Sequence, residues 1–241
     1  MKETPPTATV VERKEVTHDL FILKLAPSIP FTFTAGQYCT LGLDGIERPY
    51  SIVSAPQEST LELFIEMVPD GALTPRLHRL CVGDQVNLRP KAKGVFTLDE
   101  HFRTHLMVAT VTGVAPYVSI LRSYLRQNLH GHRFFILDGA SYQDELAYTA
   151  ELRGMGQTTP TVLYLPSVSR PADARNRGWM DGTGRVVQWV EPILTRHGLK
   201  PEDTMVYACG HPGMVATIKE NLGAQGFKVK EERFWREQAG P

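Results

Sequence analysis

The sequence has few cysteines, no long apolar run and no net charge. Its cysteines, Cys39, Cys81 and Cys209, never form a CxxC pair, which argues against a disulfide framework, a zinc site or an iron–sulfur cluster. No stretch approaches the roughly 20 apolar residues of a membrane-spanning helix, and the first residues lack the apolar core of a signal peptide. We therefore expect a cytoplasmic protein with no metal site and no membrane partner.

The charges are balanced, with 26 Lys and Arg against 26 Asp and Glu in 241 residues. This balance gives no global case for nucleic acid, so a charged partner has to be recognised by a local patch. Apolar residues make up 42% of the chain and charged ones 22%, as in an ordinary globular protein with a sizeable core. We expect no nucleic-acid partner and a monomer.

The first 100 residues consist of short segments with period-two alternation, separated by Gly, Pro and Asp turn signals. Six such segments predict an antiparallel six-stranded β-barrel. They cover residues 7–17, 20–25, 37–43, 48–54, 61–68 and 85–90. One helical segment, 72–80, interrupts them, with Leu73, Leu77 and Leu80 on one face.

The rest of the chain alternates apolar strands with longer helical segments, which predicts an α/β domain with a parallel, doubly wound sheet. The expected strands cover 106–110, 133–141, 161–169, 205–210 and 228–235, and the expected helices 115–129, 144–156, 185–198 and 213–226. The predicted domains are residues 1–102 and 103–241. A long polar loop, 169–185, lies in the second domain, and such loops in compact domains are usually functional.

Three motifs stand where strands of the second domain end: "ATVTGVAP" at 109–116, "SVSR" at 167–170 and "YACGHPGMV" at 207–215. A glycine turn that opens a helix can bind a diphosphate, although such a turn is more often only a turn. Arginines in and beside the polar loop suit phosphate oxygens, or form an ordinary solvated loop. Cys209 and Gly210 leave room for a flat ring, or the cysteine is a small buried hydrophobe.

The stretches "RPYS", "VTGVAP", "SR" and "CGHPGM", in this order and at these separations, resemble the ferredoxin–NADP reductase family, particularly its bacterial branch. The resemblance runs from about residue 7 to Trp235. It implies FAD on the barrel and NADP(H) on the α/β domain. It also implies an enzyme that exchanges a hydride between NADP(H) and flavin N5, and single electrons with a separate ferredoxin or flavodoxin.

The resemblance gives roles to the residues of "RPYS". Arg48 would bind the FAD diphosphate, Tyr50 would pack on the isoalloxazine and Ser51 would lie near flavin N5, with Pro49 stiffening the strand. These roles agree with physical chemistry, because a guanidinium fork pairs with phosphate, an aromatic face covers a flavin, and a hydroxyl can hydrogen-bond the reacting nitrogen.

A second flavin segment, "VPDGALTPRL" at 68–77, resembles the place where backbone amides and a hydroxyl hold the diphosphate. The resemblance assigns Gly71, Leu73 and Thr74 to that role. Phe64 and Ile65 match positions that contact flavin through their backbone, and they suit the barrel core almost equally well.

For the nicotinamide side, the resemblance places Thr112 close to both cofactors and Cys209 near nicotinamide C4, with Gly113 and Gly210 in the same two motifs. Ser51 and Cys209 are then the catalytic pair, in the sense that they shape the geometry of transfer without acting as nucleophiles.

The C-terminal "EERFW" resembles the family's ending, in which terminal aromatics pack on the flavin. Phe234 and Trp235 are therefore candidates for the isoalloxazine or adenine face. Six further residues follow Trp235 in this chain, whereas the aromatic is terminal in the bacterial relatives with the most similar ending.

Two departures from the family pattern concern the dinucleotide. Val111 stands where the family usually has glycine, and a β-branched residue is costly at positive φ. Ser141 stands where many relatives have arginine, which leaves Arg170 and Arg185 to carry a preference for NADP over NAD.

Three alternatives remain open at this stage. The chain could be an NADH-dependent reductase of an oxygenase, although the fused iron–sulfur domain frequent there has no cysteine set here. It could be a flavin-binding relay or regulatory subunit without nicotinamide turnover, with Val111 as its mark. It could also be a two-domain protein that binds another nucleotide.

Overall fold

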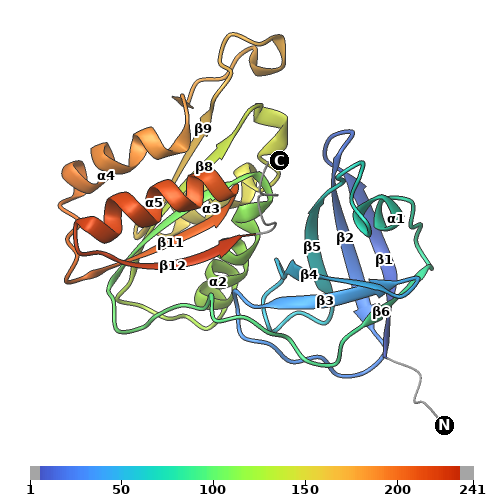
Figure 1. Ribbon diagram of the computed structural model, residues 1–241. Coiled ribbons are helices and arrows are strands. Elements are labelled where there is room, and N and C mark those ends of the chain that lie inside the picture. Colours follow the sequence, from blue (N-terminus) through green and yellow to red (C-terminus); the bar gives the residue numbers. More distant parts are fainter. Residues whose placement is uncertain (1–5, 234–241) are drawn as a thin grey trace. The chain divides into compact units, whose positions relative to one another are not determined.

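The computed structural model describes residues 6–233 and divides into two compact units (Figure 1). The first comprises residues 1–98 with 115–129, and the second comprises 99–114 with 130–241. The units are therefore not contiguous in sequence, because one helical segment after residue 114 groups with the N-terminal part. No helix within residues 6–233 is both long and apolar enough to cross a membrane.

The N-terminal part of the first unit is a six-stranded antiparallel sheet that closes on itself, which confirms the predicted barrel. Its strands are β1 (Thr7–Glu15), β2 (Leu20–Pro27), β3 (Tyr38–Leu43), β4 (Ile46–Ser51), β5 (Leu61–Glu66) and β6 (Gln85–Leu88), in the order β4-β3-β6-β1-β2-β5. A bridge between Ile52 and Leu63, with the Val53 amide donating to the Glu62 carbonyl at 2.8 Å, joins the two outer strands.

Period-two alternation builds the barrel core. In β2, Phe21, Leu23 and Leu25 lie in one apolar cluster, and in β5 the alternate residues Leu63 and Ile65 join it. The short helix α1 (Thr74–His78) adds Leu73 and Leu77 to this cluster. The predicted helical segment at 72–80 is thus present, although shorter than expected.

Helix α2 (Ala115–Arg126) packs with the barrel unit through polar contacts. The Ser119 hydroxyl donates to the Ser54 carbonyl at 2.8 Å. The Arg122 guanidinium donates to both oxygens of the buried Glu62 carboxylate at 3.3 Å each. Because the pair is largely removed from water, losing one partner would leave a buried charge.

The second unit contains a parallel sheet, as predicted. Its strands are β7 (Thr104–Thr110), β8 (Arg133–Ala140), β9 (Val162–Val168), β10 (Gly182–Thr183), β11 (Thr204–Gly210) and β12 (Lys228–Arg233), in the order β10-β9-β8-β7-β11-β12. The chain moves outward from β7 to β10 and then returns to the other side of β7. The topological switch point, where doubly wound sheets bind ligands, therefore lies between β7 and β11 at their carboxyl ends.

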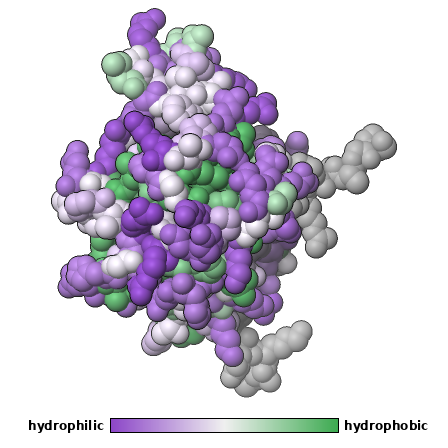
Figure 2. Space-filling model, turned by 90° about the vertical axis from the view of Figure 1, so that its left-hand side faces the viewer, coloured by the Kyte–Doolittle hydropathy of each residue, from purple (hydrophilic) through white to green (hydrophobic). Residues whose placement is uncertain are grey.

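Helices cover the sheet and bury an apolar cluster against it. The longer ones are α3 (Thr149–Thr158), α4 (Val190–His197) and α5 (Pro212–Ala224). Val190 and Ile193 of α4 and Val215 and Ile218 of α5 pack in one cluster that includes Leu106 of β7. Hydrophilic residues predominate on the face drawn in Figure 2, with apolar residues showing between them.

Short 3₁₀ turns account for the differences from the predicted helices. They are η1 (Val111–Val114), η2 (Gln143–Glu145), η3 (Ala174–Asn176) and η4 (Val186–Trp189). Helix α3 begins at Thr149 rather than near 144, because the Glu145 carboxylate accepts hydrogen bonds from the Ser141 and Tyr142 amides and closes η2 first. Strand β10, inside the long polar loop, was not predicted.

Candidate functional site

Strand β4 carries two buried hydroxyl groups, those of Tyr50 and Ser51. In the part of the chain that the structure describes, Tyr50 Oη and Ser51 Oγ are buried without a hydrogen bond. Burial raises the pKa of the Tyr50 phenol, so this group stays neutral and able to donate. A buried polar group left unsatisfied costs about 1–3 kcal/mol, and a polar ligand that bonds it removes this cost.

Arg48 and Pro49, on the same strand, are exposed. The Arg48 guanidinium donates to the Glu47 carbonyl at 2.7 Å and, among residues 6–233, forms no ion pair. Its other N–H groups are available to an anion. Pro49 lies where β4 pairs only with β3, so its missing N–H breaks no second ladder. The predicted residues of "RPYS" therefore present a cation and two buried hydroxyls from one strand.

The loop before α1 is a tight turn that depends on Gly71. The Gly71 amide donates to the Val68 carbonyl at 2.9 Å, and a Cβ at Gly71 would lie 2.8 Å from Thr74 Oγ1. Thr74 Oγ1 accepts from the Val68 amide at 3.0 Å, and Leu73 is buried in the barrel core. The structure thus brings the three predicted residues into one turn, where the Thr74 hydroxyl already holds the backbone.

Phe64 and Ile65 are both buried in β5, but they point to opposite faces of the strand. Ile65 belongs to the barrel core cluster, whereas Phe64 does not. Strand β5 pairs with β2 along one edge, and on its other edge the bridge to Ile52 is at Leu63.

The carboxyl ends of β7 and β11 approach each other so closely that only glycine fits. A Cβ at Gly113 would lie 2.1 Å from the Cys209 carbonyl oxygen, and one at Gly210, where φ is 123°, would lie 2.3 Å from Thr110 Oγ1. Thr110 Oγ1 also accepts from the His211 amide at 2.8 Å. The predicted residues of two motifs thus meet at the switch point.

The Cys209 thiol is fully buried at this point. Burial, and secondarily the Glu232 carboxylate, raise its pKa well above the ordinary value, so the thiol stays protonated. Because the thiolate is the nucleophilic form, Cys209 is not a nucleophile. Glu232 pairs with Cys209 in the register of β11 and β12, and Thr112 is buried in the adjacent η1 turn.

Val111 adopts the glycine-like conformation that the motif requires, with φ of 48°. Its side chain packs against a small apolar cluster at the ends of β8 and β9, together with Trp179 of the long loop. The cluster consists of Ala140, Leu146 and Val168. The isopropyl group therefore lies at the sheet edge where a doubly wound sheet binds its ligand.

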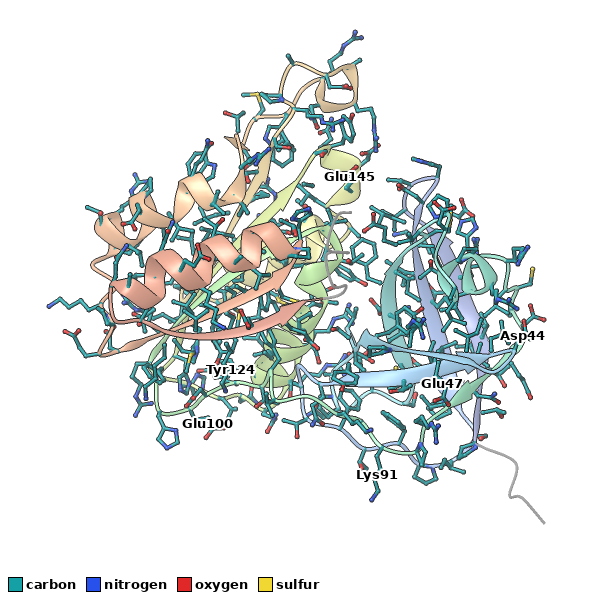
Figure 3. The ribbon with its side chains drawn as sticks, viewed as in Figure 1. Asp44, Glu47, Lys91, Glu100, Tyr124 and Glu145 are labelled. Carbon is teal, nitrogen blue, oxygen red and sulfur yellow. The ribbon has the colours of Figure 1, made fainter. Side chains whose placement is uncertain are left out.

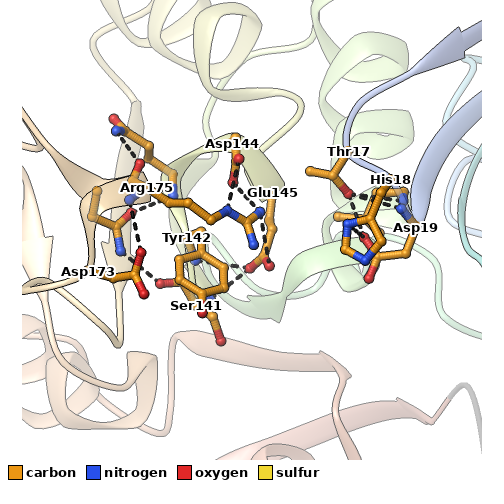
Figure 4. Close-up of polar contacts among 12 residues, drawn as sticks. Thr17, His18, Asp19, Ser141, Tyr142, Asp144, Glu145, Asp173 and Arg175 are labelled. Carbon is orange, nitrogen blue, oxygen red and sulfur yellow. Dashed lines mark hydrogen bonds and ion pairs between the residues drawn. The ribbon is translucent and has the colours of Figure 1, made fainter.

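Tyr142 contacts two arginines beyond β8 and β9, and Figure 4 shows one of them, Arg175, beside its ring. The Arg175 guanidinium carbon lies 3.7 Å from the centre of the Tyr142 ring, and Arg170 Nη1 donates to Tyr142 Oη at 2.6 Å. Arg175 is also paired with Asp144. Arg170 was predicted as a site residue, whereas Tyr142 and Asp144 were not, because their contacts join two loops that are about 30 residues apart in the sequence.

Two groups of predicted residues have a different status. Arg185 is exposed and is the residue directly before η4. Within residues 6–233, no contact joins its side chain to Tyr142 or Arg175. Phe234 and Trp235 lie outside the described residues, so their predicted contact with a flavin ring stays a prediction.

One fully buried acid also lies in this sheet. Asp138 Oδ2 accepts from Tyr164 Oη at 3.0 Å, and within residues 6–233 its Oδ1 has no partner. Burial raises its pKa to about 7. It is close in sequence to the loop that carries Tyr142 and was not predicted, since a single acidic residue in an apolar strand has no distinguishing pattern.

Comparison with known proteins agrees with this arrangement. The family model described as "Oxidoreductase FAD-binding domain" matches residues 7–96, and the one described as "Oxidoreductase NAD-binding domain" matches residues 107–220. The chain is 36% identical over 222 residues to flavodoxin/ferredoxin–NADP reductase of Escherichia coli, covering 87% of this chain and 86% of the relative. It is 32% identical over 242 residues to ferredoxin–NADP reductase A of Sorangium cellulosum, covering 91% and 83%.

A solved structure shows the same fold. The ferredoxin NADP+ reductase of Neisseria gonorrhoeae, determined with bound FAD and NADP, superimposes with a TM-score of 0.82 at 25% identity. The match covers 97% of this chain and all of that one. On the evidence of its fold, its motifs and these similarities, the chain belongs to the ferredoxin–NADP reductase family of flavoprotein oxidoreductases.

Proposed function

We propose that the protein is an FAD-dependent ferredoxin or flavodoxin–NADP(+) reductase. The observation that carries this proposal is the pair of buried hydroxyls of Tyr50 and Ser51, which have no hydrogen-bond partner among residues 6–233, beside the exposed Arg48 on β4. A flavin with a diphosphate offers a ring to the tyrosine, a hydrogen-bonding ring nitrogen to the serine and an anion to the arginine. The chemistry of this donor set therefore fits FAD.

FAD, when bound, supplies the hydride and single-electron chemistry. The protein's residues bind and orient it. Arg48 would pair with the diphosphate, the turn around Gly71 and Thr74 would present backbone amides to it, and the edge of β5 at Phe64 and Ile65 would offer backbone groups to the ring. We also propose that residues 1–102 form the FAD-binding domain and residues 103–241 the NADP-binding domain.

The nicotinamide half of the dinucleotide would bind at the switch point. There Gly113 and Gly210 keep the strand ends free of side chains, and Cys209, with its buried neutral thiol, directly precedes Gly210 in β11. With no charged nucleophile at this point, Cys209 shapes the position of the ring rather than reacting with it. Thr112, in the adjacent η1 turn, would help to orient this ring.

The electron partner would be a separate ferredoxin or flavodoxin. Basic residues on the barrel unit could steer an acidic carrier: Arg76, Arg79, Arg89, Lys91 and Lys93. Arg76 is paired with Asp44, and Arg89 is paired with Glu47, so within residues 6–233 the unpaired charge of this group comes from the exposed Arg79, Lys91 and Lys93. Figure 3 shows Asp44, Glu47 and Lys91 on this unit. We further propose that the protein works as a monomer in the cytoplasm.

The test is anaerobic reduction of the purified holoprotein by NADPH or NADH. The flavin absorbance is monitored after rapid mixing with either nucleotide. Rapid bleaching by NADPH and much slower bleaching by NADH is the expected result. The matched variants are Arg170→Gln, which should slow the reaction with NADPH, and Arg126→Gln, an exposed arginine of α2 that should leave it unchanged.

Other outcomes would favour a different function. Faster bleaching by NADH would indicate the reductase of an oxygenase. No bleaching by either nucleotide, with dithionite still reducing the flavin, would indicate a relay or regulatory subunit. Colourless protein that does not take up added FAD would contradict the flavin site itself.

A further inference from the structure

Two loops lie at the carboxyl edge of the sheet, on the side of the switch point away from Cys209. Residues 141–145 follow β8, and residues 169–185 follow β9. Because β8 and β9 lie on the opposite side of β7 from β11, a dinucleotide with its nicotinamide at Cys209 has its adenosine half toward these loops. The side chains of these two loops therefore decide whether an adenosine with a 2′-phosphate or one with a 2′-hydroxyl is bound more tightly.

The guanidinium of Arg175 is fixed on both its face and its edge. Its carbon lies 3.7 Å from the centre of the Tyr142 ring, which is a close cation–π contact. Its Nε donates to Asp144 Oδ2 at 3.1 Å, and its Nη2 donates to Asp144 Oδ1 at 2.7 Å. The two parallel N–H groups that would form a fork for phosphate are thus filled by a carboxylate (Figure 4).

The two neighbouring acids play different parts. The Glu145 carboxylate accepts from the Ser141 and Tyr142 amides at 2.9 and 3.0 Å, which closes the η2 turn, and it lies 3.8 Å from Arg175. Among residues 6–233, the Asp144 side chain is bonded only to Arg175, and about half of this side chain is exposed. Glu145 is therefore structural, whereas Asp144 can be exchanged for another anion.

We propose that Asp144 is a specificity-determining residue for the dinucleotide: its carboxylate occupies the arginine fork that otherwise binds the 2′-phosphate of NADP(H). Arg175 supplies, from the long loop, the positive charge that the chain lacks at Ser141. A 2′-phosphate has to displace the carboxylate and is repelled by it, whereas the 2′-hydroxyl of NAD(H) is not. Asp144 thus reduces the preference of the protein for NADP(H) over NAD(H). This inference rests on the proposed function.

The test uses the FAD-loaded protein and two ligands that carry only the adenosine end. Dissociation constants of adenosine 2′,5′-bisphosphate and 5′-AMP are measured by calorimetry for the wild type and for Asp144→Asn. The substitution should tighten binding of the bisphosphate by about fivefold, equivalent to about 1 kcal/mol, and change that of 5′-AMP less than twofold. The ratio of kcat/KM for NADPH over NADH should rise by a similar factor, through KM.

Controls separate the fork from a general charge effect. Glu12→Gln removes an equal charge from an exposed pair, with Lys24, in the barrel unit and should change neither ligand's affinity. In an Arg175→Gln background, Asp144→Asn should gain less than twofold. The inference would be overturned by bisphosphate binding that is intact but equal in the wild type and Asp144→Asn. If neither ligand binds the wild type and neither nucleotide reduces the flavin, the proposed function itself fails.

Discussion

Val111 provides the sharpest test of how this chain departs from its family. An L-residue in the left-handed region costs about 1–2 kcal/mol, and a β-branched residue there is a genuine outlier. With φ at 48°, Val111 carries this cost. Its side chain is half-buried against the cluster of Ala140, Leu146 and Val168, and this packing stabilises the folded protein by about 1 kcal/mol.

Replacement by glycine removes the strain and the packing together. The loss of packing is about 1 kcal/mol, and the greater freedom of glycine in the unfolded chain costs about another 0.5–1 kcal/mol. These losses nearly offset the strain relief, so the free energy of unfolding of Val111→Gly should lie within about 1 kcal/mol of the wild type. Val111→Ala keeps most of the strain and loses the packing, so it should be less stable by about 1 kcal/mol.

The assay is urea denaturation of the holoprotein for the wild type and both variants, with flavin and tryptophan signals followed together. Val111→Gly should equal or exceed Val111→Ala in stability, whereas the usual order at an unstrained site is the reverse. Val111→Gly should also lower KM for NADPH by about three- to tenfold with kcat little changed, since a bare turn lets a diphosphate approach the backbone. A glycine variant that is clearly less stable than the alanine variant would refute the strain argument.

Three further predictions test other parts of the structure, two of them with a control variant. The stability of Asp138→Asn relative to the wild type should increase as pH rises from about 4 to 8. The pKa of the Asp138 carboxyl is raised to about 7 in the folded protein, so the protonated carboxyl stabilises the wild type fully below its ordinary pKa, and this stabilisation is lost as pH rises through 7. Urea midpoints of both proteins at pH 5 and 8 would measure the change. Gly113→Ala should destabilise by about 2–3 kcal/mol, because its Cβ would lie 2.1 Å from a strand carbonyl, whereas Gly223→Ala, whose Cβ meets nothing within 4 Å, should be neutral or stabilising. Arg122→Met should cost about 3 kcal/mol by stranding its buried glutamate partner, and Arg126→Met less than about 1 kcal/mol; equal losses in thermal denaturation would contradict the assigned burial.

Most of the fold could be predicted from the sequence, because its signals are local. Alternation and turn residues are sufficient to place all six barrel strands, and apolar strands between helical segments are sufficient to predict the parallel sheet. The helix after η2 was predicted about five residues too early, since its start depends on Glu145 folding back on two amides. Periodicity carries no information about such a side-chain contact.

The candidate site was predictable only in part, for a related reason. Motifs with glycine and arginine mark the turns at strand ends, so the switch-point residues could be named in advance. The pair between Arg175 and Asp144 joins positions 31 residues apart, and the pair between Arg122 and Glu62 joins positions 60 apart. Neither distance is encoded in the spacing of residues along one element, so both pairs needed the tertiary structure.

The two departures from the family pattern are physically connected. Val111 packs against the cluster of Ala140 and Leu146, which flank the loop that contains Ser141, and Trp179 of the long polar loop packs against the same cluster. The side chain that replaces glycine therefore supports the same two loops whose arginine arrangement is altered. A change at one position moves the packing under the other, so the dinucleotide affinity of this chain is a property of the whole carboxyl edge of β7, β8 and β9.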